Sequence, residues 1–277
     1  QVSGDKVLDG RCNFQFVTLK GVVQGVQTDD LDGRYTWIAL RTAHGIVMGA
    51  AHDAPFAGYN WHRLVDAEVS FTGLCRPASG WRHGFPPHVI LNTPRDIRIL
   101  HPQPADPFLP DSRQAMPALH RHKLKGRVLA ATGSRCYIRT TGNRFVEAEA
   151  AHGSVLPPVG SALSVAGFPE IDGTRLRLTE AVFRPEAHRA IPEALPQKVA
   201  FGQLFERKSA SRGINTDFHG TLVTLGGHVS ASVPDATSGR SFGLTGENRL
   251  IVVDCSGLDV ALPPDAAVVD VTGVLLA

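Results

Sequence analysis

An internal repeat constrains the fold of this chain more than any other feature of its sequence. The pattern Leu-x-Gly-x-Val occurs three times, around Gly21, Gly126 and Gly227, at intervals of 105 and 101 residues. A second pattern follows in each copy, where alternating apolar residues lead to a glycine with one more apolar residue after it. These second glycines are Gly73, Gly167 and Gly273. Both patterns, three times in the same order, indicate three copies of one structural unit.

The residues between the two patterns predict strands. In the first copy, residues 35–40 and 45–50 are short runs rich in Val, Ile, Trp, Tyr and Met, and turn-forming residues bound them. Runs of this kind predict a β-hairpin. No 12-residue stretch keeps a period of 3.6, so we expect helix only as short turns, for example from Tyr59 to Val65.

Each copy therefore reads as a strand, a hairpin, a short loop, a fourth strand and a last strand. That order describes a five-stranded Greek-key barrel of the OB type. The glycine in the first strand has a structural role, because a strand shared by both sides of a small barrel must bend sharply. We predict an all-β fold of three tandem OB-like five-stranded Greek-key barrels.

The third copy is shorter than the others. Only four residues follow Gly273, so we expect the third barrel to be incomplete at its C-terminal end, with the closing strand missing. The unpaired edge is then expected to pair with another segment or to fray. The chain also opens at Gln1 with neither a Met nor a signal peptide, which indicates a processed or cut-out piece of a longer protein.

Pro-rich stretches separate the copies, and proline at this density favours stiff, extended connections. The predicted organisation is a first OB-like module with an N-terminal extension (1–102), a Pro-rich linker (103–117), a second module (118–186), a second linker (187–197) and a third module (198–277).

Composition limits the classes of function. Hydrophobic residues make up 43% and charged residues 19% of the chain, which supports packed cores and excludes a disordered chain. The net charge is +2 and the pI is near 8.5, without a clustered basic tail. A dedicated nucleic-acid binder usually has a more basic domain, so nucleic acid is not expected as a partner. No apolar stretch is long enough for a membrane span.

Sequence motifs of catalysis are absent. There is no Gly-x-Ser-x-Gly, no His-Glu-x-x-His and no Gly-Lys-Ser/Thr loop. We therefore predict no catalytic residue, no cofactor and no intrinsic hydrolase activity.

Metal ligands and disulfides are also not predicted. His120 and His122 lack a recognisable third ligand, and the acidic stretch 29–32 favours a hairpin turn over a calcium loop. The four cysteines form no Cys-x-x-Cys, so they are either buried free thiols or paired in one of three ways. These cysteines are Cys12, Cys75, Cys136 and Cys255.

Two groups of residues are candidates for ligand binding. Tyr35 and Trp37 are two residues apart on one strand and so lie on one face, where OB barrels often receive ligands. Packing in the core is the favoured interpretation of this pair. Trp61 and Trp81, in loops, could stack on a sugar or anchor their loops. Four cations alternate along the first strand of the second copy, on one face, and could bind an anionic glycan or polymer or simply form a solvated strand face. They are Arg121, Lys123, Lys125 and Arg127.

Several segments resemble a known family. Residues 8–23, the acidic stretch 29–32 and the strand 35–40 are similar to the extracytoplasmic region of bacterial two-component sensor histidine kinases. Residues 104–108, 122–130 and 219–223 show the same resemblance. In that family, tandem OB-like modules precede a transmembrane segment and a cytoplasmic kinase.

The resemblance implies a non-catalytic, periplasmic sensor region that transmits binding by rearranging its modules. Its partners would be a small molecule, a glycan or a periplasmic protein, and a homodimer is compatible with this role. It would meet the membrane only through segments absent from this chain. The alternative is an exported OB protein that binds single-stranded nucleic acid or polysaccharide and has no signalling role.

Overall fold

The computed structural model describes residues 2–78, 86–109, 115–172, 175–186, 195–205, 215–230, 241–255 and 261–276. The chain divides into two compact units, residues 1–122 and 123–277. Within the described ranges the α-helices are two five-residue segments, α1 (Gly4–Leu8) and α2 (Phe201–Phe205). None of the described helices has the length and apolar character needed to cross a bilayer.

The other described helical segments are short 3₁₀ turns, and one of them, Trp61–Leu64, falls where the sequence predicts a turn. The all-β prediction is therefore confirmed. The remaining turns are Ala54–Phe56, Pro94–Asp96, Pro117–Leu119 and Thr216–Phe218.

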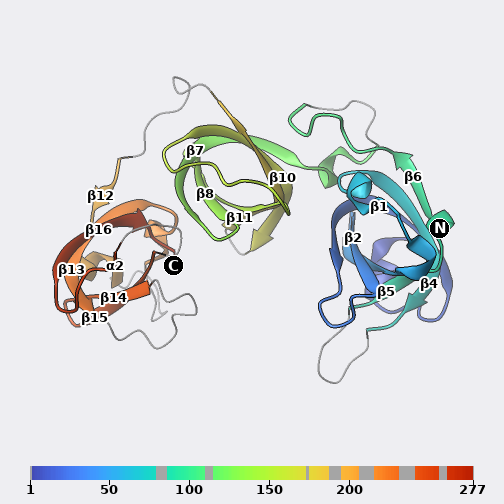
Figure 1. The fold of residues 1–277 in the computed structure, drawn as a ribbon, viewed down its shortest axis with the longest axis horizontal. Helices are drawn as coiled ribbons and strands as arrows, with labels where there is room; N and C mark the ends of the chain where they lie inside the picture. The colour runs from blue at the N-terminus through green and yellow to red at the C-terminus, as the bar shows by residue number, and fades with distance from the viewer. Residues whose placement is uncertain are drawn as a thin grey trace. The chain divides into compact units, whose positions relative to one another are not determined.

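The first unit contains a closed five-stranded ring with one added strand (Figure 1). The ring runs β1-β2-β3-β5-β4 and closes where β4 pairs with β1, while β6 continues the sheet beside β4. β5 runs parallel to β3 and antiparallel to β4. This order is that of an OB barrel. The strands are β1 (Phe16–Thr28), β2 (Tyr35–Thr42), β3 (Gly45–His52), β4 (Glu68–Arg76), β5 (His88–Leu91) and β6 (Ile97–His101).

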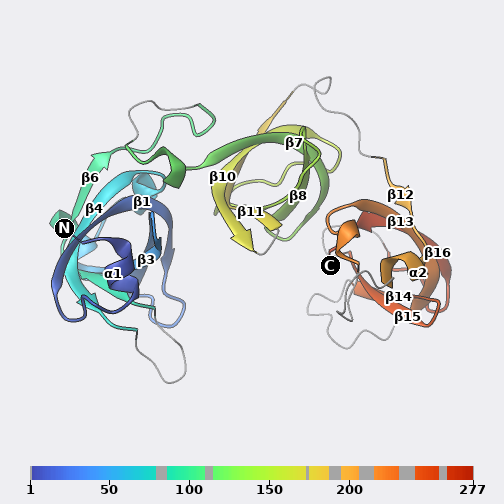
Figure 2. The same ribbon diagram turned by 180° about the vertical axis from the view of Figure 1, so that it is seen from behind.

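The second unit begins with another closed barrel, in the order β10-β11-β9-β8-β7. Figure 2 shows these strands wrapped into a ring around their own interior. The fifth strand, β11, again pairs parallel with the third, β9. The strands are β7 (His122–Thr132), β8 (Arg135–Thr140), β9 (Phe145–Ala150), β10 (Ala162–Asp172) and β11 (Arg175–Pro185).

The third copy forms a sheet that stays open in the part of the chain that the structure describes. β13 pairs with β14 and β16, and β14 pairs with β15, as in the other two copies. No described strand joins β15 to β16, so three closed barrels are not seen. The completeness of the third barrel stays a prediction. The strands are β12 (Gln197–Lys198), β13 (Leu222–Ser230), β14 (Ser241–Gly246), β15 (Arg249–Asp254) and β16 (Val268–Val274).

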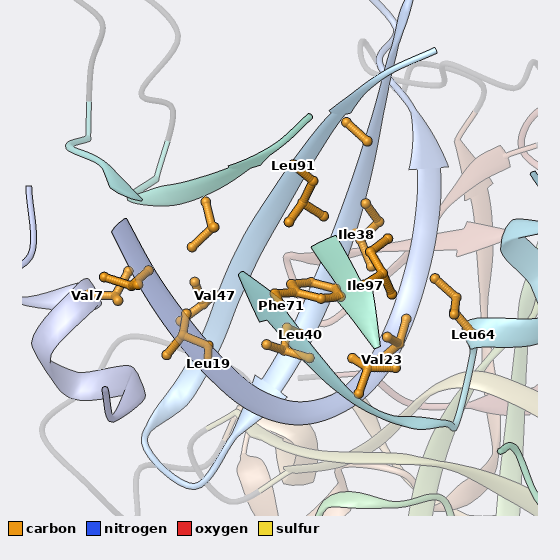
Figure 3. Close-up of a cluster of buried hydrophobic side chains, with 14 of the residues drawn as sticks. Val7, Leu19, Val23, Ile38, Leu40, Val47, Leu64, Phe71, Leu91 and Ile97 are labelled. Atoms are coloured by element: carbon orange, nitrogen blue, oxygen red, sulfur yellow. The ribbon is translucent and has the colours of Figure 1, made fainter. Parts of the chain in front are cut away.

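The interior of the first barrel is filled by side chains that alternate along its strands (Figure 3). Ile38 and Leu40 of β2 are fully buried beside Phe71 of β4 and Leu91 of β5. Because successive side chains of a strand point to opposite faces, the residues between them face outward. Tyr35 and Trp37 are among those outward residues, so the core fixes which way they point.

The repeated glycines occupy equivalent places in the three sheets. A Cβ on Gly21, Gly126 or Gly227 would collide with a carbonyl oxygen of the hairpin strand that pairs with the first strand. Gly73 and Gly167 lie in the same way against a carbonyl oxygen of the fifth strand, from Ile90 and Thr179. At Gly273 no atom of the described residues lies within 4 Å of the added Cβ. The second glycine is thus required where a fifth strand crosses closely.

This comparison predicts that the same substitution lowers stability in the first copy and leaves it nearly unchanged in the third. Gly73→Ala places a methyl group against the backbone of β5 and should cost about 1–3 kcal/mol of stability. That cost lowers the melting temperature of the first unit by about 5 °C or more. Gly273→Ala has open space and should leave the melting temperature nearly unchanged. Calorimetry of the full chain measures both melting temperatures. Equal shifts would contradict the conclusion that the second glycine is required because a fifth strand crosses it.

Candidate functional site

A groove of about 550 Å³ lies on the outer face of the first barrel. It is formed where the loop between β1 and β2 meets the outward faces of β2, β3 and β5. This is the face with which OB barrels bind oligonucleotides and oligosaccharides. Its lining residues are Asp29, Leu31, Asp32, Tyr35, Trp37, Ala50, His52, Pro55, Arg76, His88, Ile90, Leu91 and Asn92.

The strand register builds an apolar floor in the middle of this groove. Trp37 of β2 is paired with Ala50 of β3, and Ala50 is paired with Ile90 of β5. Three outward side chains therefore lie in one row across the three strands, with polar groups on either side. A ligand with a flat apolar face can rest on this row.

The Trp37 indole is fixed by the loop beside it. Its Nε1–H donates to Asp29 Oδ2 at 2.7 Å, and Asp29 Oδ1 accepts the backbone N–H groups of Leu31 and Asp32 at 2.8 and 3.2 Å. The hydrogen bond from Trp37, followed by those two, lowers the pKa of Asp29, so the carboxylate is ionised at neutral pH. One side chain thus shapes the turn and orients the ring.

The second carboxylate of this loop is also engaged within the chain. Asp32 accepts two hydrogen bonds from the Arg34 guanidinium at 2.8 Å, and this pairing lowers the pKa of Asp32 to about 2. The acidic stretch 29–32 is therefore built as a hairpin turn, as the sequence favoured. Among the described residues, no three His, Cys, Asp or Glu side chains are grouped as metal ligands.

Two histidines, which the sequence analysis did not select, complete the groove. The His52 ring meets Tyr35 edge to face with centroids 5.1 Å apart, and the His88 ring meets Trp37 in the same way at 5.3 Å. His52 Nδ1 accepts the Ala54 N–H at 3.3 Å, whereas His88 Nδ1 lies 3.0 Å from the Pro86 carbonyl oxygen, to which it must donate. Burial lowers the pKa of His88, so this ring is neutral at neutral pH.

Trp61, a further aromatic residue predicted as a candidate, is not part of the groove lining given above. Trp61 stacks on Phe56 with ring centroids 5.0 Å apart, and packs against Tyr59 at 4.6 Å. All three rings lie against the core of the first barrel, so Trp61 anchors its turn. Trp81 lies outside the described residues.

The four predicted cations are not arranged as one open ladder. Lys125 pairs with Glu186 at 3.3 Å, and Arg127 donates to the Gly160 carbonyl oxygen. Arg121 precedes β7 and its guanidinium lies 4.0 Å from Asp66. Lys123 is exposed on β7. These side chains are thus engaged by contacts within the chain, and binding of an anionic polymer by the group stays a prediction.

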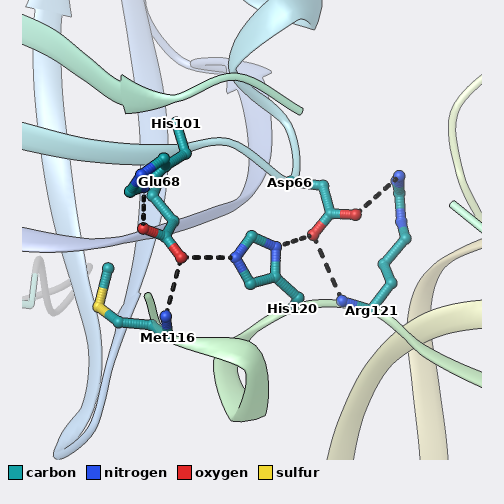
Figure 4. A network of polar contacts seen from close by, with 6 residues as sticks. All are labelled: Asp66, Glu68, His101, Met116, His120 and Arg121. Carbon is teal, nitrogen blue, oxygen red and sulfur yellow. Dashed lines mark hydrogen bonds and ion pairs between the residues drawn. The ribbon is translucent and has the colours of Figure 1, made fainter. Parts of the chain in front are cut away.

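A buried ionic cluster, which we call the His120 clasp, holds residues 115–121 on the first barrel (Figure 4). His120 Nδ1 lies 2.9 Å from Asp66 Oδ1 and Nε2 lies 3.2 Å from Glu68 Oε1. Glu68 has two further partners. His101 Nδ1 lies 2.6 Å from Glu68 Oε2, and the Met116 N–H donates to Glu68 Oε1 at 2.8 Å. With a carboxylate against each ring nitrogen, His120 is held as an imidazolium.

The clasp gives His120 a structural role in place of the metal-ligand role considered from the sequence. His122 is exposed, so the two histidines do not act together. The side chains of Asp66 and Glu68 are only 2% and 1% exposed. Acidic residues amid the apolar residues 64–71 were the signal that could have revealed the cluster, because buried carboxylates need partners.

The clasp predicts that stability depends on pH. Burial by itself would lower the pKa of His120, but the hydrogen bonds and charges of Asp66 and Glu68 outweigh it and raise the pKa. The resulting stabilisation is fully present below the unfolded value of about 6.5 and is lost as the pH rises through the raised pKa. Burial would raise the pKa of Glu68, yet its hydrogen bonds lower it, so its contribution is lost only in acid.

His120→Gln should therefore destabilise the first unit by about 3 kcal/mol near pH 6, because two buried carboxylates lose their cation. It should also remove most of the fall in melting temperature between pH 6 and 9. The exposed neighbour His122→Gln is the matched control and should keep the wild-type curve. Thermal unfolding across that pH range measures all three, and an unchanged alkaline slope in His120→Gln would show that the clasp is not protonated.

No family model matches this chain, and no curated protein matches it. Among solved structures, asparaginyl-tRNA synthetase from Pyrococcus horikoshii is 15% identical, with a TM-score of 0.29, over 43% of this chain and 27% of its own. The chain thus spans about a quarter of the synthetase. Tetrameric p202 HIN2 is 8% identical, with a TM-score of 0.25, over 62% of this chain and 94% of its own.

A third similar structure is a murine DNA-binding protein bound with double-stranded DNA. It is 9% identical, with a TM-score of 0.25, over 62% of this chain and all of its own. These neighbours contradict the sequence-based expectation that nucleic acid is not a partner, and that expectation is not retained. It rested on the net charge, the pI and the lack of a clustered basic tail, which describe the whole chain and not the chemistry of one face.

Proposed function

We propose that this chain is the non-catalytic ligand-binding part of a bacterial two-component sensor, and that the groove on the first barrel is its ligand site. The observation that carries the proposal is the fixed Trp37 ring on an apolar floor, at the ligand face of an OB barrel. The resemblance of residues 8–23 and 35–40 to sensor extracytoplasmic regions supports the sensor role and a periplasmic location.

Preorganisation supports binding at this place. The hydrogen bond to Asp29 holds the Trp37 indole before any ligand arrives, and Tyr35, 37% exposed, lies two residues away on the same face. Rings that are already ordered cost less conformational entropy on binding. An oligomeric ligand with ring-shaped units, such as a single-stranded nucleic acid or an oligosaccharide, matches two rings along one strand.

In this proposal, ligand binding transmits a signal by favouring one arrangement of the modules over others, which requires that the ligand bind those arrangements unequally. An exported binding protein without a signalling role would use the same groove. The sensor and the exported binding protein differ in what the chain is attached to. Both place the ligand in the groove, and a binding experiment tests this shared claim.

Trp37→Ala tests the site. Oligonucleotides, oligosaccharides and mononucleotides are first compared by the rise in melting temperature that they cause in the wild-type chain. A ligand found in this way should bind Trp37→Ala about tenfold or more weakly, since stacking contributes about 1–3 kcal/mol per ring. Arg41→Ala, on the same strand and outside the groove lining, is the control and should bind as the wild type does.

Calorimetric titration provides the affinities. Equal affinity of the wild type and Trp37→Ala for every ligand found would show that the groove is not the ligand site.

A further inference from the structure

We propose that the groove binds single-stranded nucleic acid, with one base stacked on Tyr35 beside His52 and the next base on Trp37 beside His88. This inference rests on the proposed function of the same groove and names its ligand.

The groove repeats one arrangement twice. Tyr35 and Trp37 each have an imidazole ring edge to face, at 5.1 and 5.3 Å between centroids and at interplanar angles of 88° and 80°. The two aromatic rings are one strand repeat apart, which is about 7 Å along β2. An extended single strand can place successive unstacked bases on platforms at such a spacing, and base stacking on aromatic rings is tolerant of sequence.

The two imidazoles offer opposite hydrogen-bonding groups to a ligand. His52 Nδ1 accepts the Ala54 N–H, so the neutral ring carries its proton on Nε2 and that atom donates. His88 Nδ1 donates to the Pro86 carbonyl oxygen, so its Nε2 is bare and accepts. Neither Nε2 has a hydrogen-bond partner among the described residues. Base edges present both donors and acceptors, which matches this pair.

The charges of the groove are arranged for a phosphate at one end. Arg76 is paired with His88 in the register of β4 and β5, and its exposed side chain lines the groove beside the Trp37 platform. The Asp29 carboxylate accepts hydrogen bonds from Trp37 and from its own loop, and Asp32 pairs with Arg34. The lining groups on which this inference rests are the two rings, the two imidazoles and the Arg76 cation.

The experiment compares two DNA oligomers of the same length and charge with the full chain. One is a mixed-sequence single-stranded octamer, and the other is the same octamer with abasic sites in place of its central bases. We expect the base-bearing octamer to bind at least tenfold more tightly. Maltoheptaose is included as a neutral oligosaccharide and should not compete.

Variants assign the roles within the groove. Trp37→Ala and Tyr35→Ala should each weaken the base-bearing octamer about tenfold and leave the abasic octamer nearly unchanged. His52→Ala and His88→Ala should change the preference among the four bases. Arg76→Ala should reduce the slope of log affinity against log salt concentration by about 0.7, the value for one phosphate contact on a single strand. Arg41→Ala, which removes a cation outside the groove, is the matched control and should keep the slope.

The outcomes separate this inference from the proposed function. If both octamers bind alike, or if neither binds, the nucleotide inference is overturned. If maltoheptaose or another non-nucleotide binds and Trp37→Ala abolishes it, the groove is still the ligand site and only the ligand class is wrong. If the octamer binds equally to Trp37→Ala and the wild type, both the inference and the assigned site fail. Circular dichroism of each variant verifies that the barrel is intact.

Discussion

The fold depends on one strand forming hydrogen bonds with two partners at once. β1 is 13 residues long; residues 16–22 pair with β4 and residues 22–28 pair with β2. To pair with strands on both sides of a small barrel, β1 must bend at Val22, where pairing changes from β4 to β2. Gly21 is the residue directly before this bend. Without a side chain there, the carbonyl oxygen of Arg41 approaches closely and the ring can close. The same geometry recurs at Gly126 and Gly227.

The groove is a consequence of that closure. Once Ile38 and Leu40 fill the barrel, Tyr35 and Trp37 must face outward, and pairing brings β3 and β5 beside them. The loop that joins β1 to β2 then lies at the end of the same face, close enough for Asp29 to hold the indole. The preorganised ring is therefore a product of the barrel and its first loop together.

The His120 clasp shows how a connecting segment becomes part of a barrel. The segment 115–121 was expected to divide between a linker and the second module, yet the first compact unit extends to His122. A buried imidazolium between two carboxylates is stable only with its partners complete, since removing one member leaves an uncompensated charge. The clasp therefore links the geometry of this segment to the protonation of one histidine.

The sequence by itself determined the features that arise from local periodicity. The threefold repeat indicated the OB-type units, alternation along the strand placed Tyr35 and Trp37 on one face, and the glycines marked the bends. These features could be predicted because each one depends on residues that are close together in the chain.

Only the tertiary structure decided which side chains meet across strands. His52 and His88 stand beside Tyr35 and Trp37 because of the register of β2, β3 and β5. Glu68 meets His120 although 52 residues separate them. Trp61 shows the converse, since the turn in which it lies was predicted but its packing on Phe56 was not. Residue spacing along one strand is local, whereas the register between strands depends on how the whole barrel closes, and that closure decides the partners.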